Sequence, residues 1–353
     1  MMKRILIGLG VFVVLLGLWV INLLYVTGAW RSIEPHFAGS CEMVPGIVGP
    51  EDLTIHPKSG IAYISSSDRR AQAQNAHIPG AIWAYNFTDP NASPVNLTPD
   101  TDIGFQPHGV SLWLGEDGQD LLFVLNHPAP KSGKPTHTVE VFSIKDEGLE
   151  HLRSLSSPEL MVMPNDIVAV GPNSFYFTNT HANPPGAAQA AETYLRLSRA
   201  KVVYYDGKKF SAALEGMRFP NGINVTENGQ RLWVASTTSN AVREYKRNTT
   251  DGSLEFLREI QLNSGPDNIE VDSAGNLWIG SHPKLLAVTA LIRDPMAISP
   301  AQVLRVTPET GSVEEIYLSE GKPLSGASVA STYRGRMLIG QIVNDGVLNC
   351  SLP

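Results

Sequence analysis

One pattern recurs six times between Glu51 and the C-terminus, and it constrains the fold more than any other feature of the chain. Each copy opens with a polar pair, followed by an apolar stretch of alternating type, a glycine-containing turn and a second apolar stretch. Successive copies start 57, 57, 56, 46 and 58 residues apart. A period of about 50 residues made of strands and turns is the signature of a β-propeller with about four strands per blade. The sequence therefore predicts an all-β, six-bladed propeller over residues 31–353.

Composition agrees with this class and excludes several others. Charged residues make up 17% of the chain, below the roughly 25% of typical soluble domains, while Gly (31) and Pro (25) are plentiful. This balance argues against a coiled coil, a disordered chain or a helical repeat, and only short stretches such as 194–201 look helical. The net charge is −7 and the only basic block is Lys3-Arg4, so a nucleic-acid partner is not expected.

The N-terminal 30 residues form a separate segment. Ile5–Val26 is 22 residues long with no charge and one polar side chain, Asn22. As a helix it would extend about 33 Å, close to the hydrocarbon thickness of a bilayer. We expect a transmembrane signal anchor, with a cleaved signal peptide as the alternative. Lys3 and Arg4 precede the run, which predicts that the propeller enters the secretory pathway and lies on the luminal or extracellular side, secreted if the segment is cleaved.

Two further features agree with that compartment. The two cysteines, Cys41 and Cys350, lie at opposite ends of the predicted propeller, where one disulfide would tie its termini together; free thiols are the alternative. Six Asn-x-Ser/Thr sites favour a glycoprotein, although chance could supply about half of them. These sites are Asn86, Asn91, Asn96, Asn224, Asn248 and Asn349.

The repeat also predicts a site, because the innermost strand of each blade lines the central channel and equivalent positions meet around its axis. The first residues of the six pairs are Glu51, His108, Asn165, Asn221, Asp267 and Ser325. The second residues are Asp52, Gly109, Asp166, Gly222, Asn268 and Gly326. Four carboxylates close together would repel one another and be costly to bury, and no Lys or Arg lies in either column. Carboxylate and amide oxygens suit a hard cation, Ca²⁺ better than Mg²⁺; the alternative is that the pairs only form turns.

These segments resemble the paraoxonase/arylesterase family, calcium-dependent lactonases and esterases built on a six-bladed propeller. The resemblance runs from about residue 40 to the end, and it is the order of the motifs that makes it specific. The matching motifs are Gly-Pro-Glu51-Asp52-Leu, Gln-Pro-His108-Gly-Val-Ser, Leu-Asn-His127-Pro, Pro-Asn165-Asp166-Ile-Val-Ala-Val-Gly-Pro, Phe-Pro-Asn221-Gly-Ile-Asn, Asp267-Asn268-Ile and Trp278-Ile-Gly-Ser-His282-Pro.

The resemblance implies two calcium ions, a pair of catalytic histidines and a disulfide between Cys41 and Cys350. It assigns His108 as the general base and His127 as its partner. The ligands implied for a catalytic calcium are Glu51, Asn165, Asn221, Asp267 and Asn268. The ligands implied for a deeper, structural calcium are Asp52, Asp166 and the main-chain carbonyl of Val110.

The chemistry is coherent without the family. A calcium ion can polarise an ester carbonyl, and a histidine can take a proton from water at neutral pH. His108 lies in the same column as the proposed ligands, and His127 closes the next strand. The alternatives are that His108 is a turn residue and His127 a strand end. Phe219 and His282 are expected at the pocket wall, whereas His56, His77, His137 and His151 look like loop or surface residues.

Some positions depart from the family pattern. Thr180 stands where the family often has Asp. The pocket loops 68–78 and 182–191 match the family poorly, so the resemblance does not specify the substrate. No Gly-x-Ser-x-Gly elbow, Walker loop or His-Glu-x-x-His motif occurs. We therefore expect a calcium-dependent hydrolase of lactones and aryl esters. The alternatives are a sugar-lactone hydrolase and a calcium-stabilised propeller that binds a partner without catalysis.

Overall fold

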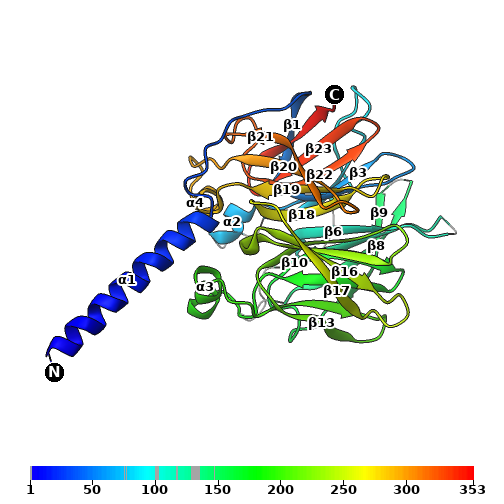
Figure 1. Ribbon diagram of the computed structural model, residues 1–353. Helices are drawn as coiled ribbons and strands as arrows, with labels where there is room; N and C mark the ends of the chain where they lie inside the picture. Colours follow the sequence, from blue (N-terminus) through cyan, green and yellow to red (C-terminus); the bar gives the residue numbers. More distant parts are fainter. Residues whose placement is uncertain are drawn as a thin grey trace.

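The computed structural model describes residues 2–353 except 75, 77, 100–102, 117, 129–135 and 147. The described residues form six four-stranded antiparallel sheets, each a blade of one propeller (Figure 1). The first strand of each blade contacts the first strands of the two neighbouring blades, which closes the ring around a central channel. The predicted six-bladed, all-β architecture is therefore confirmed.

The blades follow the sequence repeat, with the first strand of each blade innermost. Blades one to three are β2 (Pro50–Ile55), β3 (Ala62–Ser66), β4 (Ala81–Tyr85), β5 (Val95–Asn96); β6 (Pro107–Trp113), β7 (Leu121–Asn126), β8 (Thr138–Lys145), β9 (Gly148–Leu155); and β10 (Pro164–Gly171), β11 (Ser174–Asn179), β12 (Ala200–Tyr205), β13 (Phe210–Met217). Blades four to six are β14 (Pro220–Val225), β15 (Arg231–Ser236), β16 (Ala241–Arg247), β17 (Leu254–Gln261); β18 (Gly265–Val271), β19 (Leu277–His282), β20 (Ala301–Thr307), β21 (Ser312–Ser319); and β22 (Ala327–Tyr333), β23 (Arg336–Gln341), β24 (Asp345–Ser351), β1 (Ser40–Val48).

The two ends of the chain close the ring. The outermost strand of blade six is the N-terminal β1, which pairs antiparallel with the C-terminal β24. Cys41 and Cys350 are register partners in this pair and form the predicted disulfide. The bond closes a loop with a sequence separation of 309 residues. On the chain-entropy model a loop of this size stabilises the fold by up to about 5–6 kcal/mol.

The core consists of apolar layers between neighbouring blades. One such layer joins Leu53 and Ile64 of blade one to Ile47, Val329 and Leu338 of blade six. The second strand of a blade has a blade on both sides, so every residue of β3, β7 and β19 is buried. The fourth strands lie on the outside of the ring, and no residue of β9 is buried. Burial on both faces explains why the second strands read as continuous apolar runs.

Four α-helices occur in the described residues, besides a short 3-10 helix over Thr237–Ser239: α1 (Met2–Val26), α2 (Arg69–Ala73), α3 (Ala187–Tyr194) and α4 (Leu285–Arg293). The expectation of a helix over residues 194–201 was wrong, because α3 ends at Tyr194 and β12 begins at Ala200. The β-branched and aromatic residues Val202–Tyr205 favour a strand and pair with β11. Helices α2, α3 and α4 lie on the side of the propeller where α1 joins it (Figure 1).

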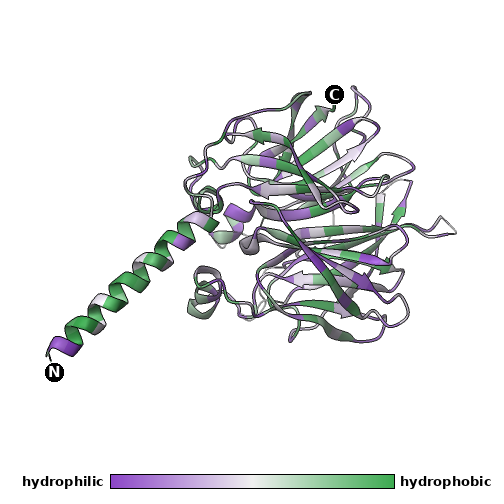
Figure 2. Cartoon of the chain, viewed as in Figure 1, coloured by the Kyte–Doolittle hydropathy of each residue, from purple (hydrophilic) through white to green (hydrophobic). Residues whose placement is uncertain are grey.

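Helix α1 projects away from the propeller and is apolar along its length, with charge only at its start (Figure 2). Among the described helices it alone is long and apolar enough to cross a membrane, a property that signal sequences share. Its end is attached to the propeller: the Leu285 amide donates to the Thr27 carbonyl at 3.0 Å, and Asn240 donates to the Val26 carbonyl at 2.9 Å. Gly28 has φ +68°, and a Cβ there would lie 2.0 Å from the Pro283 carbonyl oxygen, so the junction requires glycine.

Three of the six sequons lie within strands: Asn96 of β5, Asn224 of β14 and Asn349 of β24. Asn349 of β24 is 2% exposed, and its side-chain amide donates to the Phe87 carbonyl at 3.0 Å. Asn224 of β14 donates to the Ile269 carbonyl at 2.8 Å. A glycan cannot be attached to Asn349 in the folded protein without breaking this packing. Asn91 and Asn248 are exposed and remain candidates.

Candidate active site

The polar pairs lie at a repeated break in the inner strands. In β2 the register to β3 shifts between Pro50 and Leu53, and equivalent shifts follow the first proline of β6, β10 and β14 and Pro266 of β18. A bulge leaves its residues unpaired in the ladder and re-aims their side chains. Proline suits the position before a bulge because it has no amide to donate. The repeat thus turns each polar pair toward the channel.

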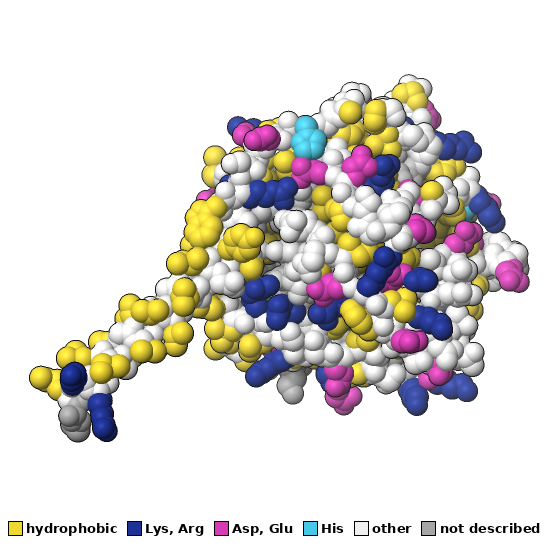
Figure 3. Space-filling view, in the orientation of Figure 1, with side chains coloured by type: hydrophobic (Ala, Val, Ile, Leu, Met, Phe, Trp, Pro, Cys, Tyr) yellow, Lys and Arg dark blue, Asp and Glu magenta, His cyan; other side chains and the backbone are white. Residues whose placement is uncertain are grey.

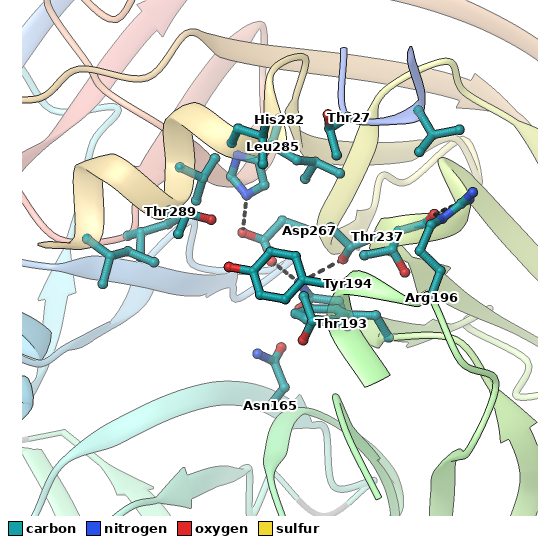
Figure 4. A pocket seen from close by; sticks show the side chains of 18 of the residues that line it. Thr27, Asn165, Thr193, Tyr194, Arg196, Thr237, Asp267, His282, Leu285 and Thr289 are labelled. Carbon is teal, nitrogen blue, oxygen red and sulfur yellow. Dashed lines mark hydrogen bonds and ion pairs between the residues drawn. The ribbon is translucent and has the colours of Figure 1, made fainter. Parts of the chain in front are cut away.

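Five of the six first-column residues line one pocket of about 320 Å³; we call these five, Glu51, His108, Asn165, Asn221 and Asp267, the pocket floor. The remaining member, Ser325, is not among the lining residues. The walls are mainly apolar and come from several elements, including the end of α1 and helix α4 (Figure 4). Wall residues include Leu23, Val26, Tyr194, Phe219, Leu285, Val288 and Ile292. The pocket therefore presents polar groups at its base beneath a largely apolar opening.

Glu51 is the most connected carboxylate of the floor. It is 3% exposed, and its Oε2 lies 3.2 Å from His108 Nε2 and 3.5 Å from Nη2 of Arg69. Its Oε1 accepts a hydrogen bond from Asn268 at 3.2 Å. Burial alone would raise the pKa of Glu51, but the charges of His108 and Arg69 lower it to about 2. Glu51 is therefore a carboxylate at neutral pH.

Arg69 is a positive charge that the repeat did not predict. It is the first residue of α2, in the poorly matched loop 68–78, and it lines the pocket. Its Nη1 donates to the Gly49 and Ile342 carbonyls at 3.0 and 3.2 Å. Burial lowers the pKa of Arg69. The two columns contain no Lys or Arg, but this guanidinium reaches the floor from outside them.

Four buried oxygens at the site accept no hydrogen bond: Oε2 of Glu51, whose contacts with His108 and Arg69 are ion pairs, and Oδ1 of Asn165, Asn221 and Asn268. All four belong to the set predicted for the catalytic calcium. A buried polar atom without a partner is costly, and a cation relieves several such oxygens at once. Among the described residues, no group of three or more His, Cys, Asp or Glu could hold a metal alone, so the amide oxygens are needed. These residues fit a hard, oxygen-seeking ion.

The fifth predicted ligand, Asp267, is engaged within the floor. Its Oδ2 lies 2.8 Å from Nε2 of His282, and its Oδ1 accepts a hydrogen bond from Asn221 (Figure 4). Burial raises the pKa of Asp267, and the contact with His282 opposes that shift. His282 was expected only at the pocket wall. The structure also makes it the partner of a predicted metal ligand.

The deeper pair, Asp52 and Asp166, lies in the second column and joins neighbouring blades. Asp52 Oδ2 accepts from the Val110 amide at 2.7 Å, and Asp166 Oδ2 accepts from the Ile223 amide at 2.6 Å. Burial and nearby carboxylates raise the pKa of Asp52 well above its ordinary value, and burial does the same for Asp166. A second positive ion here would offset the free-energy cost of burying these charges. The two carboxylates also link neighbouring blades through their hydrogen bonds to backbone amides.

The glycines of the second column are explained by close packing. A Cβ on Gly109 would lie 2.7 Å from the Cα of Asp166, and one on Gly222 would lie 2.4 Å from the carbonyl oxygen of Asp267. Both approaches are closer than side chains tolerate. The glycines therefore allow adjacent inner strands to bring their polar pairs together.

His108 and His127 form the predicted pair. Nδ1 of His108 lies 3.0 Å from Nε2 of His127, while Nε2 of His108 faces Glu51 and lies 3.5 Å from Asn165 Nδ2. His127 does not line the pocket and so reaches it only through His108. Burial lowers the pKa of His127 well below its ordinary value, with the charges of His108 and His137 adding to the effect. His127 is therefore a neutral imidazole at pH 7.

A third histidine continues this pair. Nδ1 of His127 lies 2.8 Å from Nδ1 of His137, the residue just before β8. His137 is a partly exposed loop residue, as expected, but its contact with His127 was not predicted. Burial, with His108 nearby, lowers its pKa to about 4. The signal was present in the strand pattern, because an antiparallel hairpin of β7 and β8 places positions 127 and 137 opposite each other.

Two other histidines expected at the surface are also paired, whereas His77 lies outside the described residues. His56 is 9% exposed and lies 3.0 Å from Asp120, and His151 lies 2.8 Å from Glu140. Both contacts lie away from the pocket lining. His181, by contrast, packs edge-on against Phe219 with ring centroids 4.9 Å apart and bonds to Thr193 at 2.8 Å. It supports the pocket wall without reaching the floor.

Comparisons with known proteins agree with this architecture. The Arylesterase family model matches residues 32–352. Human serum paraoxonase/arylesterase 1 is 34% identical and chicken serum paraoxonase/arylesterase 2 is 33% identical, each over 92% of this chain and 92% of the relative. Among solved structures, a putative gluconolactonase (TM-score 0.53, 17% identity, 91% of this chain and 94% of that one) shares the fold. So does a calcium-binding regucalcin from Agrobacterium tumefaciens (TM-score 0.52, 13% identity, 90% and 96%). The family model and the two relatives together show that this chain belongs to the arylesterase family.

Proposed function

We propose that the protein hydrolyses carboxylic esters, including lactones and aryl esters, at the pocket floor, with bound calcium. One observation carries the proposal: Nε2 of His108 faces the same small space as the buried oxygens of Glu51, Asn165 and Asn221 that accept no hydrogen bond. A proton acceptor and a hard-cation site thus adjoin at the base of an apolar pocket. Membership of the arylesterase family supports ester hydrolysis in general.

Calcium would be held by Glu51, Asn165, Asn221, Asp267 and Asn268. When bound there it supplies a positive charge that polarises an ester carbonyl and stabilises the negative charge developing on its oxygen. A second calcium would bind at Asp52, Asp166 and the main-chain carbonyl of Val110, with a structural role. Arg69 adds a fixed positive charge beside Glu51.

His108 would act as the general base. As a water molecule attacks the carbonyl carbon, its proton is transferred to Nε2 of His108. The bond from the carbonyl carbon to the alcohol oxygen then breaks, and that oxygen takes up the proton held by His108 as it leaves. His127 holds the opposite nitrogen of His108 at 3.0 Å and so orients the ring.

The pocket walls favour apolar substrates. Leu23, Val26, Leu285 and Ile292 surround the opening, and Phe219 lines the wall. Apolar walls gain free energy by removing an aryl or alkyl group from water. A sugar lactone, whose hydroxyl groups would lose hydrogen bonds there, fits less well. The contact of His127 with His108 at 3.0 Å also favours the ester and lactone hydrolase over the sugar-lactone alternative.

Hydrolysis by the full chain in detergent tests the proposal. We expect turnover of phenyl acetate and of an aliphatic δ-lactone with calcium present, and loss of turnover with EGTA. Gluconolactone, the polar comparison substrate, is expected to react more slowly than the aliphatic lactone. Calcium binding without turnover of any of the three would contradict an esterase and favour a propeller that only binds a partner.

We further propose that α1 anchors the protein in a membrane with the propeller on the luminal or extracellular side. The apolar surface of α1 continues to its junction with the propeller, and Leu23 and Val26 near that junction line the pocket (Figure 3). Lys3 and Arg4 at the other end favour a cytoplasmic N-terminus. In carbonate extraction of cell membranes, the protein should stay in the pellet, and protease added to sealed microsomes, whose outer face is cytoplasmic, should spare the propeller. Release into the carbonate supernatant would contradict the anchor.

A further inference from the structure

His137 extends the histidine pair away from the pocket floor. The three imidazoles follow one another by nitrogen contacts of 3.0 Å between His108 and His127 and 2.8 Å between His127 and His137. Neighbouring rings are inclined by 72° and 83°. The chain of contacts begins at Nε2 of His108 beside Glu51 and ends at His137, which is partly exposed.

The sheet places His127 and His137 opposite each other. Asn126, the last residue of β7, is the register partner of Thr138, the first residue of β8. His127 and His137 are the residues just beyond these two strand ends. Directly opposed residues have Cβ atoms about 4.5–5.5 Å apart, close enough for their rings to meet. Both backbones are held in addition: the His127 amide donates to the Gln106 carbonyl at 3.0 Å, and Ser156 donates to the His137 carbonyl at 2.8 Å.

Proton positions in such a chain depend on one another. A neutral imidazole donates through one nitrogen and accepts through the other. If His108 is to accept a proton at Nε2, its own proton must be on Nδ1, which then donates to Nε2 of His127. The proton of His127 must in turn be on Nδ1, and that nitrogen needs an acceptor. Nδ1 of His137 lies at hydrogen-bond distance from it and can serve.

We propose that His137 is a positioning residue for ester hydrolysis: its Nδ1 accepts the Nδ1 proton of His127 and thereby holds His127 and His108 in the tautomers that leave His108 Nε2 free. The inference rests on the proposed function, because it takes His108 as the base. His137 does not touch the pocket, so its effect on the reaction is transmitted through His127. The depressed pKa values of His127 and His137 agree with these two imidazoles being neutral at pH 7.

Two substitutions separate this role from simple packing. In His137→Asn the side-chain oxygen can take the place of Nδ1 as acceptor, whereas His137→Leu removes the acceptor and keeps apolar bulk. We expect His137→Leu to lower kcat by about 10-fold, at the lower end of the 10- to 100-fold cost of losing an outer-shell partner. KM and calcium affinity should be unchanged, and His137→Asn should retain kcat within about 2-fold of the original.

Nitrogen-15 NMR of the imidazoles provides the second measurement. His127 is expected to carry its proton on Nδ1 in the original protein and in His137→Asn, and to lose this preference in His137→Leu. The matched control is His151→Asn, because His151 is an exposed histidine of the same blade that contacts Glu140 and lies outside the chain of three. It should leave both kcat and the His127 tautomer unchanged.

The outcomes are decisive for His137 alone. An unchanged kcat and an unchanged His127 tautomer in His137→Leu would overturn the proposal, as would a proton on Nε2 of His127 in the original protein. If His137→Leu fails to fold, the tautomer of His127 in His137→Asn decides. If the original protein hydrolyses no ester or lactone, the proposed function fails, whereas the NMR measurement still shows whether His137 fixes the tautomer.

Discussion

Replacement of His108 by glutamine is expected to lower kcat for phenyl acetate and for an aliphatic δ-lactone by about 10²- to 10⁴-fold, the usual contribution of a general base. Glutamine keeps a polar group where Nε2 lies but cannot accept a proton at neutral pH. His108 contacts two proposed calcium ligands, Glu51 and Asn165, but is not itself a ligand, so calcium affinity should change little. Steady-state kinetics at saturating calcium and calorimetric titration of calcium measure the two effects separately.

The control for this substitution is His151→Gln, which changes a histidine of the same blade outside the pocket lining. It should leave kcat within about 2-fold of the original. Retention of kcat by His108→Gln would show that another group activates water. A parallel fall in calcium affinity and kcat would instead show that His108 supports the ion.

Replacement of Asp267 by alanine is expected to lower the affinity for one of two bound calcium ions by at least about 100-fold and to abolish activity at micromolar calcium. This loss exceeds the roughly 10- to 100-fold cost of removing an outer-shell partner. Asp267 carries one of the two carboxylates of the pocket floor, and Asn221 and His282 both contact it. The deeper ion should remain, because Asp52 and Asp166 bond to backbone amides of the neighbouring blades. Calorimetry on chelator-treated protein counts the ions and gives both affinities.

Asp251→Ala is the matched control, since Asp251 is a carboxylate that bonds to Ser253 in an exposed turn. It should bind both ions with the original affinities. An Asp267→Ala protein that keeps two tight ions would refute the ligand set derived from the first column. One that keeps activity with a single ion would show that the pocket calcium is not needed for hydrolysis.

Much of the site was predictable because it repeats. Glu51, His108, Asn165, Asn221 and Asp267 occupy the same position of successive copies, and a closed ring of blades brings equivalent positions to one axis. Once the repeat predicts a propeller, the convergence of these side chains follows from symmetry. The layering of the second column, with Asp52 and Asp166 bonded to neighbouring inner strands, follows from the same geometry.

Arg69 was not predictable in the same way. It belongs to the non-repeating segment after β3, and its place beside Glu51 depends on contacts with Gly49 and Ile342, the latter far away in the sequence. His137 was missed for a different reason, because it pairs with His127 only through the register of β7 and β8. Leu23 and Val26 of α1 reach the pocket through the docking of the helix on Pro283 and Leu285.

The sequence by itself determined the blade number, the family, the two cysteines that close the ring and the polar columns at the channel. These depend on residue type and spacing, which a repeat displays many times over. Tertiary structure alone decided which residues outside the repeat reach the floor and walls: Arg69 from α2, His137 opposite His127, and the end of α1. Their positions depend on single long-range contacts, and such contacts leave no periodic pattern along the chain.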